Sequence, residues 1–268
     1  MQGLLFPALL KYWRGKRGLS QLDLATEAEV SSRHLSFLES GRSQPSSEMV
    51  LRLFSVLRVP LRAQNQALRA AGFPPHYPEP GLEDLSPPIA AALEQMMVEH
   101  LPYPLTVVGL DGRILHANAA ARILFAAFLH DPSQLPDPPD MISLTFDPSL
   151  MRPFLQNWEE VAHGMVARLH REHLERPEDP RLADALARAL AYPGVPGAWR
   201  RPDLSEEVSP ALTVRLQRGA LQVGFLVTVT VFSAPQQVTL DELRIESCYP
   251  LDEVTRTWCR ETLAGVVA

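Results

Sequence analysis

Residues 19 to 46 read LSQLDLATEAEVSSRHLSFLESGRSQPS, and this stretch decides the fold of the N-terminal region. Ser20 is a residue type that caps the start of a helix, and Asp23 follows at the third helical position, where its carboxylate can reach back to the cap. The predicted helix ends near Glu27. A second helix is predicted from Ser31, another capping residue, to just before Gly41, because glycine readily takes the left-handed conformation that follows a helix end. Two short helices separated by a tight turn of about four residues indicate a helix-turn-helix.

The second of these helices carries the residues that we expect to read DNA. In a helix-turn-helix its first residues reach the base edges in the major groove. Phe37, one turn further along on the outer side, could meet a thymine methyl group while Arg33 bridges the two acceptors of a guanine. Phosphates are expected at Gln21, at Arg42 and at the amide groups of a helix that opens at Ser46. The predicted DNA-binding residues are Gln21, Ser31, Ser32, Arg33, His34, Ser36, Phe37, Arg42 and Ser46.

Apolar spacing extends this motif to five helices within residues 1–73. A helix with an inner face precedes the motif, another follows it, and residues 61–71 form the fifth. Residues 1–73 hold ten basic and five acidic residues, a net charge of +5, whereas the remainder has a net charge of −11. A basic head on an acidic body suggests that only the head meets a polyanion. The apolar positions of the two flanking helices are Leu5, Leu9, Leu10 and Trp13 in the first and Val50, Leu53, Phe54 and Leu57 in the fourth.

A proline cluster separates the head from the rest of the chain. Residues 74, 75, 78, 80, 87 and 88 are prolines, a composition that sustains neither a helix nor an inner strand. We therefore expect a DNA-binding domain at 1–73, a linker at 74–88 and a second domain at 89–268. No apolar run has the roughly 18 residues of a membrane span, so a cytoplasmic protein without a membrane partner is predicted.

The second domain is expected to be an antiparallel sheet with helices against one side. Residues 104–117 contain two strand-like runs around Asp111-Gly112, a strong hairpin signal, and Asn118 can cap the next helix. A long helix is predicted from about Pro153 to Leu174. The other predicted elements are a helix at 181–191, strands at 211–217, 222–233 and 238–248, and a last helix from near residue 252.

Several short sequence motifs resemble those of known families. The run at 19–46 is similar to the Xre or lambda-repressor type of helix-turn-helix, and SSRHLSFLE and AAGF are closer to MmyB-like transcription regulators. This likeness is dense over residues 4–77. Further along, NWEEVA (157–162) and TLDELRIES (239–247) resemble the MmyB-like ligand-binding domain, which has a PAS-like fold. The resemblance implies a sequence-specific DNA-binding transcription regulator, not an enzyme, whose second domain senses a small apolar, fatty-acid-like molecule.

Large apolar residues of the second domain are the candidates for lining a ligand cavity, although a residue of this kind more commonly belongs to a packed core. Arg200 and Arg201 could anchor a carboxylate or could simply face solvent. No cofactor other than a bound fatty acid or a similar apolar ligand is expected. The candidate ligand-binding residues are Phe125, Phe128, Leu144, Phe146, Phe154, Trp158 and Trp199.

Other chemistries receive less support from the sequence. GxSxG, HExxH and glycine-rich phosphate loops are absent, which argues against an enzyme. The histidines at 163, 170 and 173 could bind a metal, but a solvated helix face is the more common use of such spacing, so no metal site is predicted. Cys248 and Cys259 could form a redox switch or be buried thiols. The expected partners are double-stranded DNA, a small apolar effector and a second copy of the chain, since two half-sites raise the affinity for an operator. The alternatives for the second domain are a ligand-free dimerisation module or an enzyme.

Overall fold

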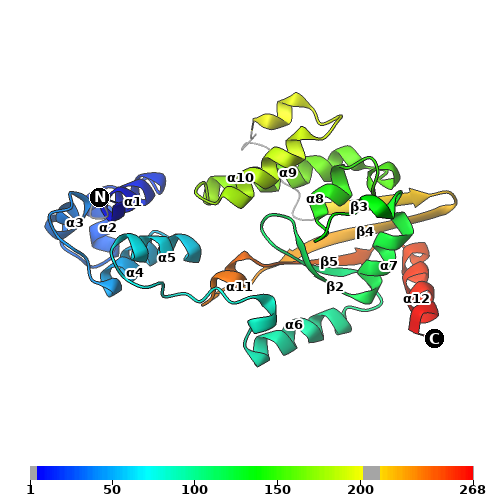
Figure 1. Cartoon of the computed structure of the whole chain (residues 1–268), viewed down its shortest axis with the longest axis horizontal. Coiled ribbons are helices and arrows are strands. Elements are labelled where there is room, and N and C mark those ends of the chain that lie inside the picture. Colours follow the sequence, from blue (N-terminus) through cyan, green and yellow to red (C-terminus); the bar gives the residue numbers. More distant parts are fainter. Residues whose placement is uncertain (1–4, 202–211, 268) are drawn as a thin grey trace. The chain divides into compact units, whose positions relative to one another are not determined.

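Two structural units make up the chain in the computed structural model, which describes residues 5–201 and 212–267 (Figure 1). The first unit comprises residues Met1–Pro80 together with Ala234–Asp241, and we call it the N-terminal domain. The second comprises Gly81–Ser233 and Glu242–Ala268, and we call it the C-terminal domain. The boundary near residue 80 falls inside the proline-rich stretch, but the small segment 234–241 joins the N-terminal domain from far along the sequence.

The helices of the N-terminal domain begin at the residues that the sequence indicates. In the described residues up to 80 they are α1 (Leu5–Lys16), α2 (Gln21–Glu27), α3 (Ser32–Glu39), α4 (Ser47–Val56) and α5 (Leu61–Ala70). The Ser20 hydroxyl accepts a hydrogen bond from the Asp23 amide, and the Asp23 carboxylate accepts one from the Ser20 amide, which completes a capping box. The predicted helix-turn-helix and its five-helix setting are therefore confirmed.

All five helices contribute side chains to one hydrophobic cluster. Trp13 of α1, Leu24 of α2, Leu38 of α3 and Phe54 of α4 are at most 1% exposed. The first helix differs in detail from the prediction, because Leu5 is exposed and Phe6 takes its place in the core. The other predicted inner positions of α1 and α4 are buried or partly buried.

The C-terminal domain is built on an antiparallel sheet with the strand order β2-β1-β5-β4-β3. Its strands are β1 (Leu105–Val108), β2 (Ile114–Ala117), β3 (Leu212–Arg218), β4 (Leu221–Thr230) and β5 (Arg244–Pro250). The last strand lies in the middle, with Val107 of β1 opposite Ile245 and Thr228 of β4 opposite Ser247. The turn between β1 and β2 contains Gly112 with a positive φ of 85°, a conformation that favours glycine. The sheet with its covering helices confirms the expected PAS-like class of fold.

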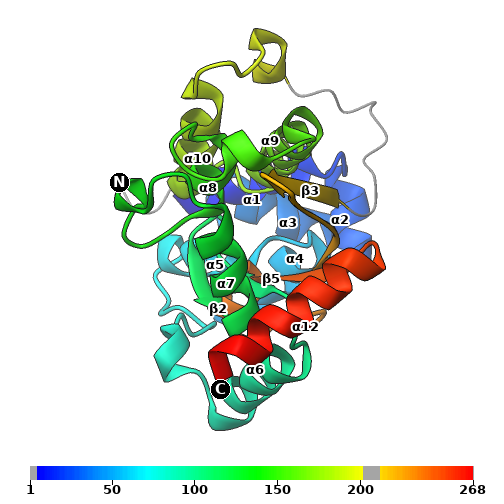
Figure 2. The ribbon, with the colours of Figure 1, turned by 90° about the vertical axis from the view of Figure 1, so that its right-hand side faces the viewer.

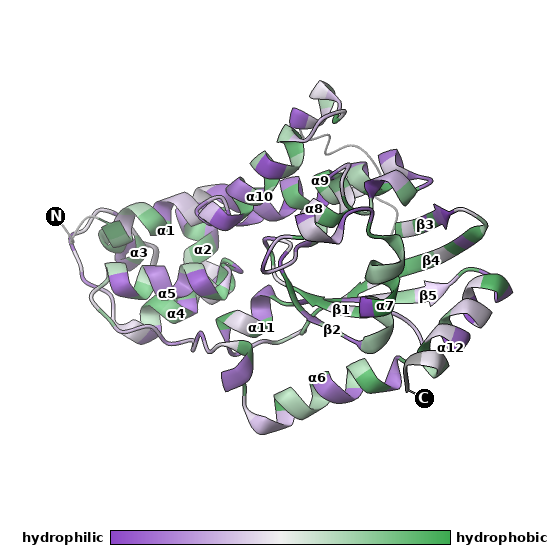
Figure 3. Ribbon diagram, turned by 45° about the vertical axis from the view of Figure 1, so that its right-hand side comes forward, coloured by the Kyte–Doolittle hydropathy of each residue, from purple (hydrophilic) through white to green (hydrophobic). Residues whose placement is uncertain are grey.

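Helices pack around the sheet of the C-terminal domain. They are α6 (Pro87–Glu99), α7 (Ala119–Phe128), α8 (Met141–Phe146), α9 (Trp158–Glu175), α10 (Pro180–Ala191) and α12 (Glu253–Val267), and the short 3₁₀ turns are Leu82–Asp84, Pro132–Gln134, Arg152–Phe154 and Gly197–Arg200. Figure 3 shows that α7 and strands β1 and β4 are mainly hydrophobic. The last helix, α12, packs beside α7 and against β4 (Figure 2). Among the described residues, none of the helices combines the length and apolar character required to cross a membrane.

Four predicted elements have different bounds in the structure. The strand predicted at 222–233 is β4, which ends at Thr230. Residues 238–242 form a short helix, α11 (Val238–Glu242), so the predicted strand at 238–248 begins only at Arg244. The long helix begins at Trp158 and not near Pro153, because Leu155 bridges to Leu216 of β3 and extends the backbone there. Of the strand predicted at 211–217, residue 211 lies outside the described residues. The helices α6 and α8 were not predicted.

Candidate DNA-binding surface and ligand cavity

The turn before α3 leaves the start of that helix in solvent. Glu29 takes a left-handed conformation with a φ of 54°, and the Val30 amide donates back to the Ala25 carbonyl at 2.9 Å. Ser32 and Arg33, in the first turn of α3, are exposed. An exposed polar turn at a helix N-terminus, with its free amide groups, is the geometry that can approach a groove of DNA.

Arg33 and Phe37 form a pair on the outer side of α3. The Arg33 guanidinium lies 5.4 Å from the centre of the Phe37 ring, which indicates a cation–π contact. Phe37 is partly buried, whereas the sequence suggested an exposed ring. Within the described residues Arg33 has no ion pair, and neither has the exposed Arg42, so both guanidinium groups are available to an anion.

Some of the predicted DNA-binding side chains also hold the helices in place. The Ser31 hydroxyl accepts a hydrogen bond from the His34 amide, and the Ser46 hydroxyl accepts one from the Met49 amide. Both serines are exposed caps. The Gln21 side-chain amide donates to Glu39 at 2.7 Å, so Gln21 ties α2 to α3. His34 and Ser36 are partly buried on α3.

A buried ionic contact that the sequence did not reveal fixes the angle of α3. Arg14 of α1 binds the Glu39 carboxylate with Nε at 2.6 Å and Nη2 at 3.0 Å. Burial alone would raise the pKa of Glu39, but the hydrogen bonds from Arg14 and Gln21 outweigh it and hold that pKa below its ordinary value. Because Glu39 joins α1, α2 and α3, it orients the recognition helix without being available to DNA.

The C-terminal domain contains a cavity of about 450 Å³ between the sheet and helices α7, α8 and α9. Alternate residues of neighbouring strands point into it, as the twofold periodicity of a strand requires. The strand residues that line it are Thr106 of β1, Leu212, Val214 and Leu216 of β3, Phe225, Val227 and Val229 of β4, and Glu246 and Cys248 of β5. A volume of this size is in the range of small-molecule sites.

Two of the seven candidate ligand-binding residues lie at this cavity, and five do not. Phe125 of α7 and Leu144 of α8 line it. Phe128 and Phe146 are fully buried in two hydrophobic clusters of the domain. Phe154 packs against Phe128 with ring centres 6.1 Å apart. Phe128, Phe146 and Phe154 therefore belong to packed parts of the domain and do not line the cavity.

The two tryptophans form a separate aromatic cluster. Trp158 lies 6.2 Å from Trp199 between ring centres, and its indole donates to the Thr145 carbonyl at 2.9 Å. Arg152 stacks on Trp158 at 3.8 Å. Arg200, beside Trp199, hydrogen-bonds the Leu190 carbonyl at 3.4 Å, so it does not line the cavity. Arg201 is exposed and is also absent from the cavity lining.

Charged residues mark one part of the cavity wall. Arg168 of α9 pairs with Glu246 of β5 at 2.7 Å, and both residues line the cavity. Burial by itself would lower the pKa of Arg168, but attraction to Glu246 outweighs it and raises that pKa. Arg171, one turn further along α9, also lines the cavity and forms no ion pair with any residue described. Glu160 of α9 lines the cavity as well. The wall therefore combines an apolar surface with the Arg168–Glu246 pair, the Glu160 carboxylate and the Arg171 guanidinium group.

The histidines of α9 do not form the solvated face that their spacing suggested. His170 is buried, and its Nε2 lies 2.8 Å from the Trp199 carbonyl oxygen. His163 lines the cavity and lies 5.1 Å from the Trp199 ring centre. Over residues 5–201 and 212–267, no group of three or more histidine, cysteine or acidic residues is arranged to hold a metal ion.

Both cysteines are free thiols in an apolar setting. Burial raises the pKa of the Cys259 thiol to about 11. The pKa of Cys248, which lines the cavity, is also raised well above its ordinary value by burial. Because thiolate is the reactive form, this setting disfavours rapid oxidation at neutral pH.

Both domains match known protein families. Residues 10–64 match the helix-turn-helix family, and residues 89–261 match the MmyB-like transcription regulator ligand binding domain, which is more than half of the chain. The chain belongs to the MmyB-like transcription regulators. The family is one of regulators and not of enzymes, so this regulator consists of a DNA-binding helix-turn-helix and a ligand-binding domain.

Two further comparisons add little to this assignment. No curated protein matches the chain. A solved structure of an RNA-binding Light-Oxygen-Voltage receptor is similar at 13% identity, over 96% of this regulator and 63% of that protein, with a TM-score of 0.25. This regulator thus spans less than two thirds of that receptor's length.

Proposed function

We propose that this regulator binds a specific operator through α3 and that its C-terminal domain senses a small apolar molecule with an anionic head, such as a fatty acid. The observation that carries the ligand class is the cavity wall, which is apolar along β3, β4 and α7 and bears Arg168 and Arg171 on α9. Apolar surface supplies affinity in such sites, and a few polar groups fix orientation. A carboxylate is the natural partner of an unpaired guanidinium.

The ligand proposal is tested by identifying what the purified full chain carries. Native mass spectrometry followed by extraction should find an apolar acid at one molecule per chain. Arg171→Gln should weaken rebinding of the extracted acid roughly 10-fold, in line with about 1.5 kcal/mol for a charged hydrogen bond, whereas the exposed Arg201→Gln should not. An empty chain that also rejects saturated fatty acids of several lengths would contradict the proposal and favour a domain that only dimerises.

The DNA proposal is tested on operator sequences selected from random DNA. Arg33→Ala should weaken binding by about 1–3 kcal/mol and relax the preference at one base position, because a side chain at the start of α3 contacts base edges. Arg52→Ala serves as the control, since Arg52 is exposed on α4 and pairs with Glu48. Affinity should also fall steeply between low and moderate salt. Equal losses for both variants with no change in base preference would contradict the assignment of α3.

A homodimer follows from the same proposal. One α3 of eight residues buries little surface on DNA, and two half-sites multiply the affinity. The selected operators should therefore contain two related half-sites whose centres are about 10 base pairs, or a multiple of that, apart. Light scattering on the free chain and on the complex measures the number of copies, and a single copy on a single half-site would contradict the dimer.

A further inference from the structure

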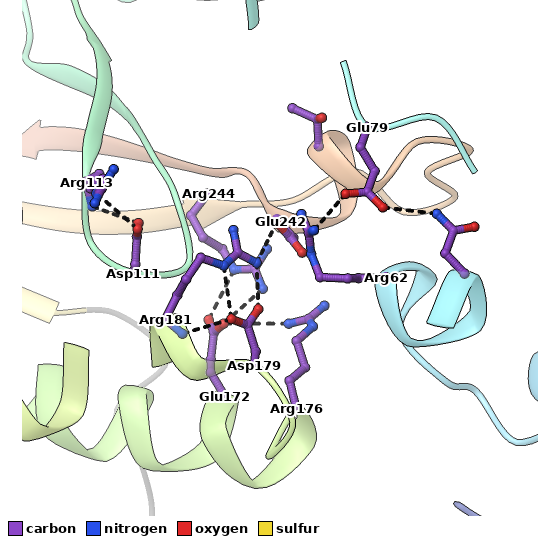
Figure 4. Close-up of polar contacts among 12 residues, drawn as sticks. Arg62, Glu79, Asp111, Arg113, Glu172, Arg176, Asp179, Arg181, Glu242 and Arg244 are labelled. Carbon is purple, nitrogen blue, oxygen red and sulfur yellow. Dashed lines mark hydrogen bonds and ion pairs between the residues drawn. The ribbon is translucent and has the colours of Figure 1, made fainter. Parts of the chain in front are cut away.

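The linker after α5 is held by a buried asparagine. Asn65 of α5 is 0% exposed, and its Oδ1 accepts hydrogen bonds from the amides of His76 and Tyr77, both at 3.0 Å. Its Nδ2 donates to the Tyr77 carbonyl at 2.8 Å and to Glu79 at 3.2 Å. Arg62 adds an ion pair to Glu79 at 2.7 Å (Figure 4). The proline-rich stretch is therefore a fixed part of the N-terminal domain up to residue 80.

The same linker is bound by residues from the connection between β4 and β5. The Val238 amide donates to the Pro78 carbonyl at 2.9 Å, and the Thr239 hydroxyl donates to the Pro80 carbonyl at 2.6 Å. Val238 is fully buried. We call these contacts to residues 76–80, made by Asn65, Val238 and Thr239, the linker clamp. Val238 and Thr239 of the clamp thus belong to the segment 234–241, which connects β4 and β5, and both of these strands line the cavity.

Directly after the clamp, alternate residues pair with α9 and α10. Glu242, the last residue of α11, pairs with Arg181 of α10 at 3.0 Å. Arg244 pairs with Glu172 of α9 at 3.2 Å, and Figure 4 shows both contacts. The third pair is Glu246 with Arg168 at 2.7 Å. Because β5 side chains alternate, residues 244 and 246 face the helices together. Glu242, at the end of α11, reaches the same helices through Arg181, and we call the three pairs the ion-pair ladder.

The ladder begins in the cavity and ends at α11. Its first pair, Arg168 with Glu246, lines the cavity. Its last member, Glu242, lies three residues after Thr239 of the clamp, within the same five-residue helix. Hydrogen bonds between charged groups are strong and direction-dependent, so a ligand head that competes for Arg168 shifts Glu246.

We propose that the ion-pair ladder and α11 together form the route by which occupancy of the cavity changes the hold of the linker clamp on the DNA-binding domain. This inference rests on the proposed ligand-sensing function and names its route. A polar head at Arg168 releases or tightens Glu246, β5 carries the change to Glu242, and α11 alters the hydrogen bonds from Val238 and Thr239 to the linker.

Hydrogen exchange of the full chain, without any ligand, tests the route. Arg168→Met cuts the ladder at the cavity. Exchange in peptides 74–80 and 234–241 should then change by about 2- to 30-fold, the range that measured coupling along such routes gives. Thr239→Val removes a clamp hydrogen bond directly and shows the response of these peptides when the clamp itself is altered. Arg152→Met is the matched control, since Arg152 contacts Trp158 and the Pro193 carbonyl and takes no part in the ladder.

The outcomes separate the route from the proposed function. The route is overturned if exchange in the linker peptides is unchanged in Arg168→Met but clearly altered in Thr239→Val. This holds even if an apolar acid is bound in the cavity. A response of the same size in Arg152→Met would also overturn it, because the effect would then be a general loosening. If Arg168→Met does not fold, Glu172→Gln cuts the ladder at its middle pair and is judged by the same peptides. An empty cavity on extraction would contradict the ligand proposal and leave this exchange result standing.

Discussion

The two domains fill their interiors in different ways. In the N-terminal domain, side chains from α1 to α5 form one continuous cluster, and the buried carboxylate of Glu39 is fully engaged by Arg14 and Gln21. In the C-terminal domain, buried apolar residues form two clusters, and members of both, such as Phe225 and Met165, border the cavity. Densely packed cores resist deformation, whereas a cavity leaves neighbouring elements room to shift. This difference suits the two proposed roles, in which one domain presents α3 rigidly and the other responds to a ligand.

The largest expected effect compares two core truncations. Leu38→Ala should lower the free energy of unfolding of the N-terminal domain by about 2–5 kcal/mol, because Leu38 is 0% exposed in a dense cluster. Met165→Ala should lower that of the C-terminal domain by less than about 2 kcal/mol, the low end for such truncations, since Met165 already borders open space. Urea unfolding followed by hydrogen exchange reports each domain. Equal losses would remove the contrast between the two interiors.

The next effect concerns the carboxylate that orients α3. Glu39→Gln should destabilise the N-terminal domain by about 1.5–3 kcal/mol, because it weakens charged hydrogen bonds that are largely out of water. Glu48→Gln is the control, since the Glu48–Arg52 pair is exposed, and it should change stability by less than about 0.5 kcal/mol. Thermal unfolding measures both variants. If Glu39→Gln leaves the stability unchanged, apolar packing alone sets the angle of α3.

Two glycine-to-alanine substitutions should have opposite effects on the free energy of unfolding. Gly164 lies inside α9 and lines the cavity, and a Cβ there would lie 3.4 Å from Leu212. Gly164→Ala should therefore stabilise the C-terminal domain by up to about 1 kcal/mol through helix propensity. Gly72 ends α5 with a φ of +89°, so Gly72→Ala should cost about 1–2 kcal/mol. Urea midpoints test the pair, and a loss for Gly164→Ala would show that the cavity wall has no room there.

The smallest expected effect is a difference in acid sensitivity. Burial lowers the pKa of His100 below its ordinary 6.5, so the unfolded chain binds a proton more readily and the C-terminal domain loses stability as the pH falls below about 6.5. The lowered pKa of Glu39 stabilises the N-terminal domain above its ordinary 4.5, and this contribution is lost only below that value. Thermal melts between pH 8 and 4 should show the two domains responding in these separate windows. His100→Gln should flatten the response near pH 6, and an unchanged slope would contradict it.

Local signals in the sequence predicted the helix caps of the N-terminal domain and the first hairpin of the C-terminal domain well. The caps Ser20, Ser31 and Ser46 and the turn at Asp111-Gly112 depend on hydrogen bonds that span only a few residues, so the sequence contains all their partners. The pair Arg14–Glu39 spans 25 positions, and no local pattern points to it.

The cavity wall depends on contacts between distant elements. Aromatic content pointed to Phe128 and Phe146, but packing between layers decides which rings meet the cavity. A usable signal did exist in the alternation of Leu212, Val214 and Leu216, which indicates that one face of β3 is apolar. The place of residues 234–241 in the N-terminal domain had no such signal, because Val238 finds Pro78 only in the folded chain.

The segment 234–241 has a consequence for how such regulators can be recombined. A gene fragment that ends after residue 80 encodes α1 to α5 and the linker but omits Val238 and Thr239, which bind that linker. Exchanging the head between two regulators at a single crossover would therefore pair a linker with a foreign β4–β5 connection. A chimera that keeps its regulation needs three crossovers, one near residue 80 and one on each side of the segment 234–241, so the heads and sensors of this architecture should be inherited together.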